Sequence, residues 1–429
     1  MTEVEWIETA IVSARPQAVA ALLRYFRDLD VAEEAFQDAC LRALKTWPEK
    51  GPPRDPAAWL IFVGRNFALD AQRRRKKETS LPDEELLSDV DDAEVALVER
   101  LDSDDYRDDI LRLLFICCHP DLPKTQQIAL ALRLVCGPTV KQIARAFLVT
   151  ESAMEQRITR AKRAVTAAGV PFETPGAPER AERLTAVAAM IYLIFNEGYS
   201  ATAESLAARG QLCEEAIRLA RLLLRLFPAE PEIMGLLALM VLQHSRAVTR
   251  FDANGLFVLL EDQDRSRWNR DLIGEGLALV DKALRHQQPG PYQVQAAIAA
   301  LHARAPRAQD TDWQEIDLLY STLERMHPSP VITLNRSVAV SKLRGAAEAL
   351  AMIEPLEPKL TGYFHFYGVR GAFLQQLGRL AEAREAYNQA IALANSAPEA
   401  AHIRLHLDRL SKDSSSPAGP KSEPAKKKR

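Results

Sequence analysis

The side chains with the clearest chemical character in this chain form one face of a predicted helix between residues 151 and 165. Hydrogen-bonding groups stand toward the start of this face, and cations stand toward its end. Amide and hydroxyl groups suit the edges of DNA bases, whereas guanidinium groups suit phosphates. This face therefore predicts contact with duplex DNA. It carries Ser152, Gln156, Thr159, Arg160 and Arg163, with Arg157 and Lys162 beside them.

The helix that carries this face needs a scaffold, and residues 113–165 can supply one as three helices. Apolar residues repeat at helical spacing in the last two of them: Val140, Ile143, Ala144 and Phe147 in one, and Met154, Ile158, Ala161 and Val165 in the other. A tight turn at residues 148–150 joins them, and Thr150 or Glu151 begins the second. This is the pattern of a helix-turn-helix, whose second helix fits the major groove. The alternative interpretation is a solvated face on an ordinary helical bundle.

Two further helices are predicted nearer the N-terminus, and their charges differ. Residues 29–47 form an amphipathic pattern, with acidic and amide side chains paired at four-residue spacing on one side. Residues 56–77 form a helix that starts with proline, and the stretch from Arg54 to Lys77 holds seven Lys/Arg against two Asp. A cationic helix end with aromatic residues upstream suits nucleic acid, although a basic surface helix that binds nothing would look similar.

Taken together and in order, these segments resemble sigma factors of the extracytoplasmic-function group of the sigma-70 family. DVAEEAFQDACLRALKTW resembles the group's region 2.2, AAWLIFVGRNFALDAQRRRKK resembles regions 2.3 to 2.4, and LPKTQQIALALRLVCGPTVKQIARAFLVTESAMEQRITRAKR resembles region 4. The resemblance covers about residues 8–170. It implies a sigma region 2 domain at residues 8–78 and a region 4 helix-turn-helix domain at residues 110–170.

The resemblance also implies roles for individual residues. Those implied to contact core RNA polymerase are Asp30, Glu33, Glu34, Gln37 and Asp38. Those implied to lie near the melted −10 strand of promoter DNA are Asn66, Asp70, Arg73 and Arg74. The −35 duplex would meet Ser152, Gln156, Arg157, Arg160 and Arg163.

The chain departs from the family pattern at three places. Ala35–Phe36 replaces a more usual aliphatic pair. Glu155 stands where a basic or small polar residue is common, which leaves the −35 sequence preference open. The segment PEKGPPRD at residues 48–55, expected as a loop, sits where the family captures a flipped base, and its prolines predict an atypical pocket.

An acidic linker is expected between the two domains, at residues 79–109. From Asp83 to Asp109 there are thirteen Asp/Glu and two Arg, a composition that favours an extended chain without its own core. The resemblance implies that this linker threads the polymerase channel. A plain solvated spacer is the alternative.

More than half of the chain follows residue 177, and its pattern is helical over almost all of residues 178–410. Near its end, residues 367–395 resemble a tetratricopeptide repeat, with Gly371 at the small position and Ala383, Tyr387 and Ala390 at later sites of the ~34-residue unit. Such helix pairs stack into a solenoid with a concave groove, which we expect to hold a protein or peptide ligand. The Ser-, Pro- and Lys-rich tail at residues 411–429 is expected to be disordered.

Two breaks interrupt the helical pattern of this extension. In IYLIFNEGY, at residues 191–199, Gly198 is expected to cap a helix that ends there. In RFDANGLFVLLEDQDRSRW, at residues 250–268, a short hairpin or an ordered loop is expected. Some extracytoplasmic-function sigma factors carry an extension with an LIFNEGY-like motif and tetratricopeptide-like repeats. That resemblance implies a built-in module that regulates the factor or contacts polymerase.

The composition of the chain, and the sequence motifs that it lacks, exclude several classes of protein. The chain has 429 residues, 47% of them hydrophobic, and a net charge of −3, so its DNA-facing charge must be local. No secretion signal or membrane-spanning run is found, and five cysteines without metal-ligand spacing fit a reducing cytoplasm. No nucleotide-binding or hydrolase motif is present, so we expect no enzyme activity, no cofactor and no metal.

The sequence therefore predicts an all-α protein: two small helical sigma domains, the second a helix-turn-helix, joined by an acidic linker and followed by a tetratricopeptide-like solenoid. The predicted function is a cytoplasmic sigma factor that binds core RNA polymerase and promoter DNA. One alternative is a DNA-binding regulator with a repeat sensor that acts without polymerase. Another is a repeat scaffold with an incidental helix-turn-helix.

Overall fold

A computed structural model describes residues 5–76, 103–168, 177–199, 206–394 and 397–415, apart from single residues at 52, 120, 148 and 254. Its contacts divide the chain into two compact units. Unit 1 comprises Met1–Ala201 and Ser205–Pro228, and unit 2 comprises Thr202–Glu204 and Ala229–Arg429. The fold is all-α, as the sequence predicts, and the extended pairing found in the described residues is one isolated bridge in unit 2.

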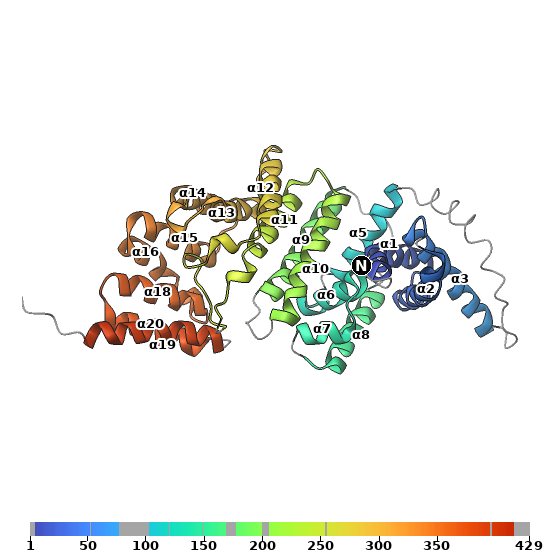
Figure 1. Cartoon of the computed structure of the whole chain (residues 1–429), viewed down its shortest axis with the longest axis horizontal. Helices are drawn as coiled ribbons and strands as arrows, with labels where there is room; N and C mark the ends of the chain where they lie inside the picture. The colour runs from blue at the N-terminus through green and yellow to red at the C-terminus, as the bar shows by residue number, and fades with distance from the viewer. Residues whose placement is uncertain are drawn as a thin grey trace, which may run out of the picture. The chain divides into compact units, whose positions relative to one another are not determined.

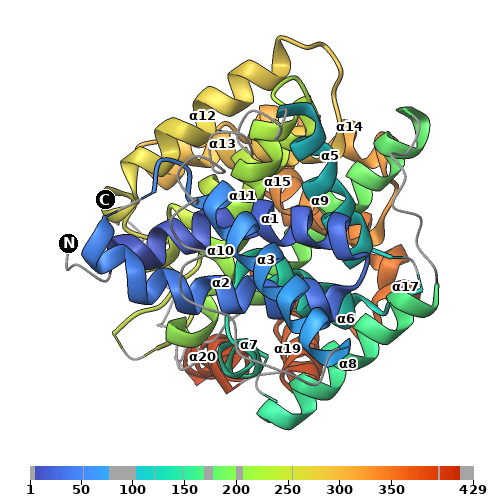
Figure 2. The ribbon, with the colours of Figure 1, turned by 90° about the vertical axis from the view of Figure 1, so that its right-hand side faces the viewer.

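Three helices form the N-terminal part of unit 1: α1 (Glu5–Phe26), α2 (Leu29–Lys50) and α3 (Pro56–Lys76). They pack against one another, as the blue ribbons of Figure 2 show. Side-chain caps set two of their starts, because Asp28 accepts hydrogen bonds from backbone N–H groups of α2, and Asp55 does the same for α3. Trp47 lies between Trp6 and Trp59, with ring centroids 6.0 and 5.3 Å away, and anchors α2 in the shared core.

The structure corrects the prediction that residues 48–55 form a loop. Helix α2 continues through Pro48 to Lys50, so the connection to α3 is shorter than expected. The helix ends at Gly51, which adopts a φ of 81° while its N–H donates to the carbonyl of Trp47. Glycine reaches this left-handed region without steric cost, which explains why the helix ends there rather than at the proline.

The second part of unit 1 contains α5 (Ser103–Cys117), α6 (Lys124–Ala131), the single π-helical turn η2 (Leu132–Cys136), α7 (Val140–Ala146) and α8 (Glu151–Ala167). Thr139 and Gln142 form a reciprocal capping box at the start of α7. Thr150 caps α8 by accepting from the N–H of Ala153, so of the two predicted starts it is Thr150 that caps the helix and Glu151 that begins it. The predicted apolar face of α8 is buried, at Met154, Ile158, Ala161 and Val165.

Helices α9 (Ala177–Tyr199) and α10 (Leu206–Leu226) complete unit 1. They pack against each other and against α5, α6 and α7. The prediction that Gly198 caps α9 is wrong, because the helix runs through it to Tyr199. The rings of Phe195 and Tyr199, one helical turn apart, stack at 5.4 Å and keep this last turn helical.

Unit 2 is an array of helices in which neighbours along the chain pack together (Figure 1). Its α-helices are α11 (Pro231–His244), α12 (Arg270–Leu284), α13 (Pro291–Arg304), α14 (Trp313–Met326), α15 (Pro330–Arg344), α16 (Ala346–Ile353), α17 (Glu357–Leu360), α18 (Phe364–Gln376), α19 (Leu380–Leu393) and α20 (Ala397–Ser415). Its 3₁₀ turns are η4 (Ala247–Thr249), η5 (Arg265–Arg267), η6 (Ala308–Asp310) and η7 (Glu354–Leu356). Close helix approach is visible between α18 and α19, where a Cβ on Gly371 would lie 2.6 Å from ring carbons of Tyr387.

The long connection between α11 and α12 is the ordered hairpin-like segment that the sequence predicts. Phe251 and Phe257 form its antiparallel bridge, and the N–H of Val258 donates to the carbonyl of Arg250. Arg265 fixes the far end by donating to the backbone carbonyls of His302 and Ala305 at 2.6 and 2.8 Å. The segment is therefore part of the packed unit.

Several expectations fall at the edges of the described part of the chain. The acidic segment at residues 79–102 and the tail at 416–429 lie outside the described residues, whereas α5 already begins at Ser103, inside the expected linker. Residues 411–415, at the start of the expected tail, continue α20. Among the helices that the structure describes, none has the length and apolar character needed to cross a bilayer.

Candidate functional site

The face of α8 predicted to meet the −35 duplex is open to solvent. Four of its five residues are exposed, Ser152, Gln156, Arg160 and Arg163, and Arg157 is half-buried. Helices α6 and α7 pack against α8, whose apolar side is buried, and Thr150 caps its start, so the polar side of α8 faces solvent. Glu155, also exposed, stands beside this face. The arrangement is that of a helix-turn-helix with its second helix accessible.

The set predicted near the −10 strand lies on α3. Asn66 is exposed, whereas the side chains of Asp70, Arg73 and Arg74 fall outside the described part of that helix. Near Asn66, the guanidinium of Arg65 lies 4.4 Å above the ring centroid of Tyr25 on α1. This pair lines a cleft of about 340 Å³ together with Ala21, Leu22, Arg24, Arg27, Ile61 and Phe62. Sequence reasoning missed this cationic and aromatic group, because its members come from two separate helices.

The acidic set on α2 divides into exposed and buried members. Asp30, Glu34 and Gln37 are exposed, and Asp38 is half-buried. Partial burial, and then the neighbouring Glu34 carboxylate, raise the pKa of Asp38 above its ordinary value. Glu33 is different, because only 5% of it is exposed.

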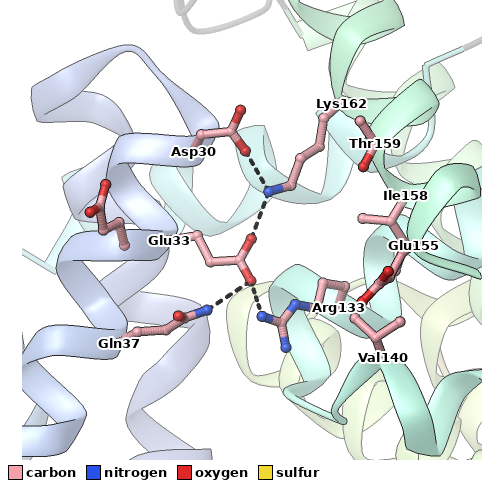
Figure 3. Close-up of a pocket in the computed structure, with 10 residues that line it drawn as sticks. Asp30, Glu33, Gln37, Arg133, Val140, Glu155, Ile158, Thr159 and Lys162 are labelled. Atoms are coloured by element: carbon pink, nitrogen blue, oxygen red, sulfur yellow. Dashed lines mark hydrogen bonds and ion pairs between the residues drawn. The ribbon is translucent and has the colours of Figure 1, made fainter. Parts of the chain in front are cut away.

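Glu33 is buried because cations from the helix-turn-helix part converge on it (Figure 3). Its carboxylate accepts from Lys162 of α8 at 2.8 Å, forms an ion pair with Arg133 of η2 at 2.5 Å, and accepts from Gln37 at 3.3 Å. The ammonium of Lys162 also lies 2.6 Å from Asp30. We call Asp30, Glu33, Arg133 and Lys162 the ionic cluster.

The charge of Lys162 is well supported in this position. Burial lowers its pKa, but the hydrogen bonds to Asp30 and Glu33 outweigh burial and leave the pKa above the ordinary value. Lys162 is therefore protonated throughout the physiological range. The ionic cluster borders an open cleft of about 390 Å³ between α2 and α8 that Val140, Glu155, Ile158 and Thr159 also line.

A second contact joins the same two parts of unit 1. Arg15 of α1 donates to the backbone carbonyls of Arg133 and Leu134 at 2.8 and 3.2 Å, near the end of η2. A cation placed at the end of a helix stabilises the free carbonyl groups there. The guanidinium of Arg15 also lies 4.8 Å from the ring centroid of Phe36, on α2. Burial, and then the nearby Arg133, lower the pKa of Arg15.

Helix α10 covers the other side of η2. Arg218 directs a guanidinium nitrogen to the carbonyls of Val135 and Cys136, each at 3.4 Å, and pairs with Glu215 at 2.9 Å. The thiol of Cys136 is fully buried there, and burial followed by the Glu215 carboxylate raises its pKa. The helix-turn-helix part therefore rests on α10, although α10 lies beyond the region that the sequence assigns to it.

The cysteines show no sign of reactivity in the described structure. Cys117, Cys118, Cys136 and Cys213 are buried and Cys40 is half-buried, all as free thiols. Burial raises the pKa of both Cys40 and Cys118 to about 12. Among the described residues, no group of three or more His, Cys, Asp or Glu side chains is placed to hold a metal ion.

Sequence reasoning missed the contact between the two parts of unit 1. Glu33 and Lys162 are separated by 129 residues, and each fits a local role: an acidic face on α2 and a basic patch beside the DNA face of α8. Nothing in either segment indicates that they meet. Helical periodicity identifies which face a residue shares, whereas it carries no information on which distant element covers that face.

Comparison with known proteins agrees with this geometry. Residues 11–78 match the model of Sigma-70 region 2, and residues 112–165 match that of Sigma-70, region 4. Residues 183–284 match a family of unknown function (DUF6596), and that match spans both α9–α10 and the start of unit 2. The chain is 68% identical over 410 residues to an uncharacterized protein of Rhizobium meliloti (strain 1021), covering 96% of this chain and 97% of that protein. With region 2 and region 4 both present and in order, this chain belongs to the sigma-70 family and is similar to its extracytoplasmic-function factors.

Proposed function

We propose that this protein binds core RNA polymerase and directs promoter-specific initiation by reading a −35 element with α8 and a −10 element with α3. The observation that carries the proposal is the open polar face of α8, with hydrogen-bonding side chains at its start and arginines toward its end, on a helix-turn-helix whose apolar side is fully packed. Such a face can read base edges and pair with phosphates at once. The work is binding rather than catalysis, and its place is the cytoplasm, where polymerase and DNA are found.

We assign polymerase and DNA to different helices according to the charge of their exposed side chains. The acidic face of α2, at Asp30, Glu33, Glu34, Gln37 and Asp38, is the surface we assign to polymerase. The polar face of α3, at Asn66, Asp70, Arg73 and Arg74, is assigned to the opened −10 strand, where cations and nearby aromatic rings favour single-stranded DNA. Two modest DNA contacts on one chain reinforce each other through effective concentration.

We assign two roles to the extension. The α9–α10 hairpin supports region 4, since Arg218 reaches the carbonyls at the end of η2. Unit 2 is a tetratricopeptide-like array that receives a protein or peptide signal. Supporting this, Gly371 lies directly against Tyr387, and Ala383 and Ala390 are fully buried, as small and aromatic positions of such repeats require.

In vitro transcription tests the main proposal. Purified bacterial core polymerase is given sheared genomic DNA, with and without the full-length protein, and start sites are mapped by sequencing. New starts that share an upstream motif are the expected result. Stable binding of the protein to DNA together with no binding to core polymerase would instead support a regulator that acts without polymerase.

Truncation tests the role of the extension. Ending the chain after Pro228 keeps the α9–α10 hairpin, whereas ending it after Ala177 removes it. We expect the longer fragment to keep a folded region 4 and the shorter one to lose stability, because the shorter one exposes the apolar surface that α9 and α10 cover. Transcription by the longer fragment, compared with the full chain, then reports whether unit 2 restrains or supports activity.

A further inference from the structure

Region 4 of the protein covers Glu33, one residue of the surface assigned to polymerase, whereas Asp30, Glu34 and Gln37 of that surface stay exposed. Glu33, in the middle of that surface, is 5% exposed, and its carboxylate is taken up by Lys162 and Arg133. Asp30, one turn before it, shares the same ammonium group. A protein partner that approaches this face of α2 must therefore displace both cations.

The contact between region 4 and α2 consists mainly of ion pairs, which can open and re-form. Buried ion pairs give little net stability, because each charge loses its hydration when the pair forms and regains it when the pair opens. The cation side chains retain some water contact here, since 16% of the Lys162 side chain and 19% of the Arg133 side chain are exposed. Arg15 adds hydrogen bonds to carbonyls of η2, which water can replace.

We propose that the ionic cluster is an autoinhibitory latch: Lys162 and Arg133 of region 4 hold Glu33 and Asp30 and keep α8 across the cleft from the acidic face of α2, and polymerase binds only after region 4 has moved away. This inference rests on the proposed function, because it assigns regulation to the same polymerase-binding surface. The apparent affinity for polymerase is then the intrinsic affinity reduced by the fraction of molecules in the open form.

The latch affects the surface assigned to polymerase and leaves the DNA-facing side of α8 accessible. Ser152, Gln156, Arg160 and Arg163 remain exposed while Lys162 is engaged on a different side of α8. The closed form can therefore contact duplex DNA, whereas it withholds Glu33 of α2 from polymerase. Changes to the latch should alter polymerase affinity and leave non-specific duplex affinity nearly unchanged.

Charge removal is the first test. Lys162→Met and Arg133→Met keep most of the aliphatic stem but remove the charge, and Lys141→Met is the matched control, since Lys141 is an exposed cation of α7 outside the latch. Binding of each full-length variant to core polymerase is measured by titration. We expect each latch variant to bind on the order of tenfold more tightly than the unaltered protein, and the control to match the unaltered protein.

A reversible covalent lock is the second test. Asp30→Cys and Lys162→Cys are combined and bridged with a short bismaleimide that contains a central disulfide. The native thiols interfere little. Burial raises the pKa of Cys40 and Cys118 to about 12 and also raises the pKa of Cys117 and Cys136, and Cys213 is buried. The bridged protein should bind core polymerase at least roughly tenfold more weakly than the same double-cysteine protein after a reductant has opened the bridge. Both forms carry the same substitutions and adducts, so the comparison reports the link alone.

The outcomes separate the latch from the function on which it rests. Equal polymerase affinity of the unaltered protein, the latch variants and the bridged form would overturn the latch and leave the sigma function standing. Failure of every form to bind core polymerase, including the latch variants and the reduced form, would overturn both. Tighter binding by the methionine variants, together with loss and recovery in the bridged form, would support the latch.

Discussion

Lys162 of α8 places its ammonium nitrogen 2.8 Å from a carboxylate oxygen of Glu33 in α2, joining region 4 to region 2 across 129 residues of chain. The same carboxylate holds Arg133, so one buried anion is shared by two cations from the other region. Glu33 belongs to the surface proposed for polymerase, and Lys162 lies beside the face of α8 proposed for DNA. The contact therefore connects the stability of unit 1 with its availability to polymerase.

The first prediction concerns the stability of this contact. Glu33→Gln removes the charge that two cations share, so the partly buried Arg133 loses this carboxylate partner and Lys162 keeps only Asp30. We expect the free energy of unfolding of unit 1 to fall by about 1–3 kcal/mol, measured by urea denaturation of the full chain. Glu34→Gln, at the exposed neighbouring position, should change it by less than about 0.5 kcal/mol. Equal effects of the two substitutions would contradict the importance of the shared carboxylate.

The second prediction concerns DNA affinity. Arg160→Ala and Arg163→Ala each remove an exposed cation from the face of α8 assigned to the −35 duplex. Each should weaken binding to duplex DNA and reduce the slope of log affinity against log salt by about 1 if the arginine pairs with one phosphate. Arg285→Ala, which removes an exposed cation of unit 2, serves as the control. An unchanged salt slope in both α8 variants would exclude this face as the DNA contact.

The third prediction concerns packing in unit 2. Gly371→Ala would place a methyl group 2.6 Å from ring carbons of the buried Tyr387, so the ring must shift and strain its hydrogen bond to Gln375. We expect a loss of about 1–3 kcal/mol in the stability of unit 2, seen as a lower thermal midpoint. Gly362→Ala meets no atom within 4 Å and should have little effect. If the two alanines behaved alike, the close approach of α18 and α19 would be refuted.

The fourth prediction concerns acid sensitivity. Burial, and then the nearby Arg265, lower the pKa of His302 from 6.5 to about 4, and its Nδ1 is buried with no hydrogen-bond partner among the described residues. Because the folded pKa is depressed, the unfolded chain binds more protons, so His302 supports folding above pH 6.5 and loses that contribution as the pH falls toward 4. Burial likewise lowers the pKa of His365, His402 and His406.

The measurement for this prediction is the stability of unit 2 as a function of pH. Between pH 6.5 and 4 the contribution of His302 should fall with a slope approaching about 1.4 kcal/mol per pH unit. His302→Phe keeps an aromatic ring beside Trp313, 5.4 Å away, but cannot take up a proton, so it should reduce the slope, while His365, His402 and His406 still contribute. His286→Gln, at an exposed site, should leave the curve as it is.

Local structure was the part that the sequence could predict. The buried residues of α8, the Thr150 cap and the α3 start at Pro56 all follow from periodicity and from hydrogen bonds within a few residues. The errors were also local, at helix ends: α2 passes through Pro48, and α9 passes through Gly198. Helix α2 ends instead at Gly51, where the backbone turns to a positive φ, and in α9 the rings of Phe195 and Tyr199 stack across the last turn.

The sequence predicts the acidic face of α2 and the polar face of α8 separately, but it does not predict that α2 and α8 contact each other. An exposed acidic helix and an exposed basic helix look the same in sequence whether they meet each other or meet outside partners. Arg15 illustrates the limit, because it caps η2 from a helix more than a hundred residues earlier in the chain. Such a contact depends on how helices are packed, and nothing in the residues next to Arg15 encodes it.

The most direct measurement is the distance between the two regions before and after polymerase is added. Glu49→Cys on α2 and Ala167→Cys on α8, both exposed positions, would carry a donor and an acceptor dye in the full-length protein. High energy transfer in the free protein and a large decrease on addition of core polymerase, at the concentration where transcription starts, is the result that we predict. Energy transfer that stays unchanged while the protein supports transcription would contradict the account, because polymerase would then bind α2 without moving region 4.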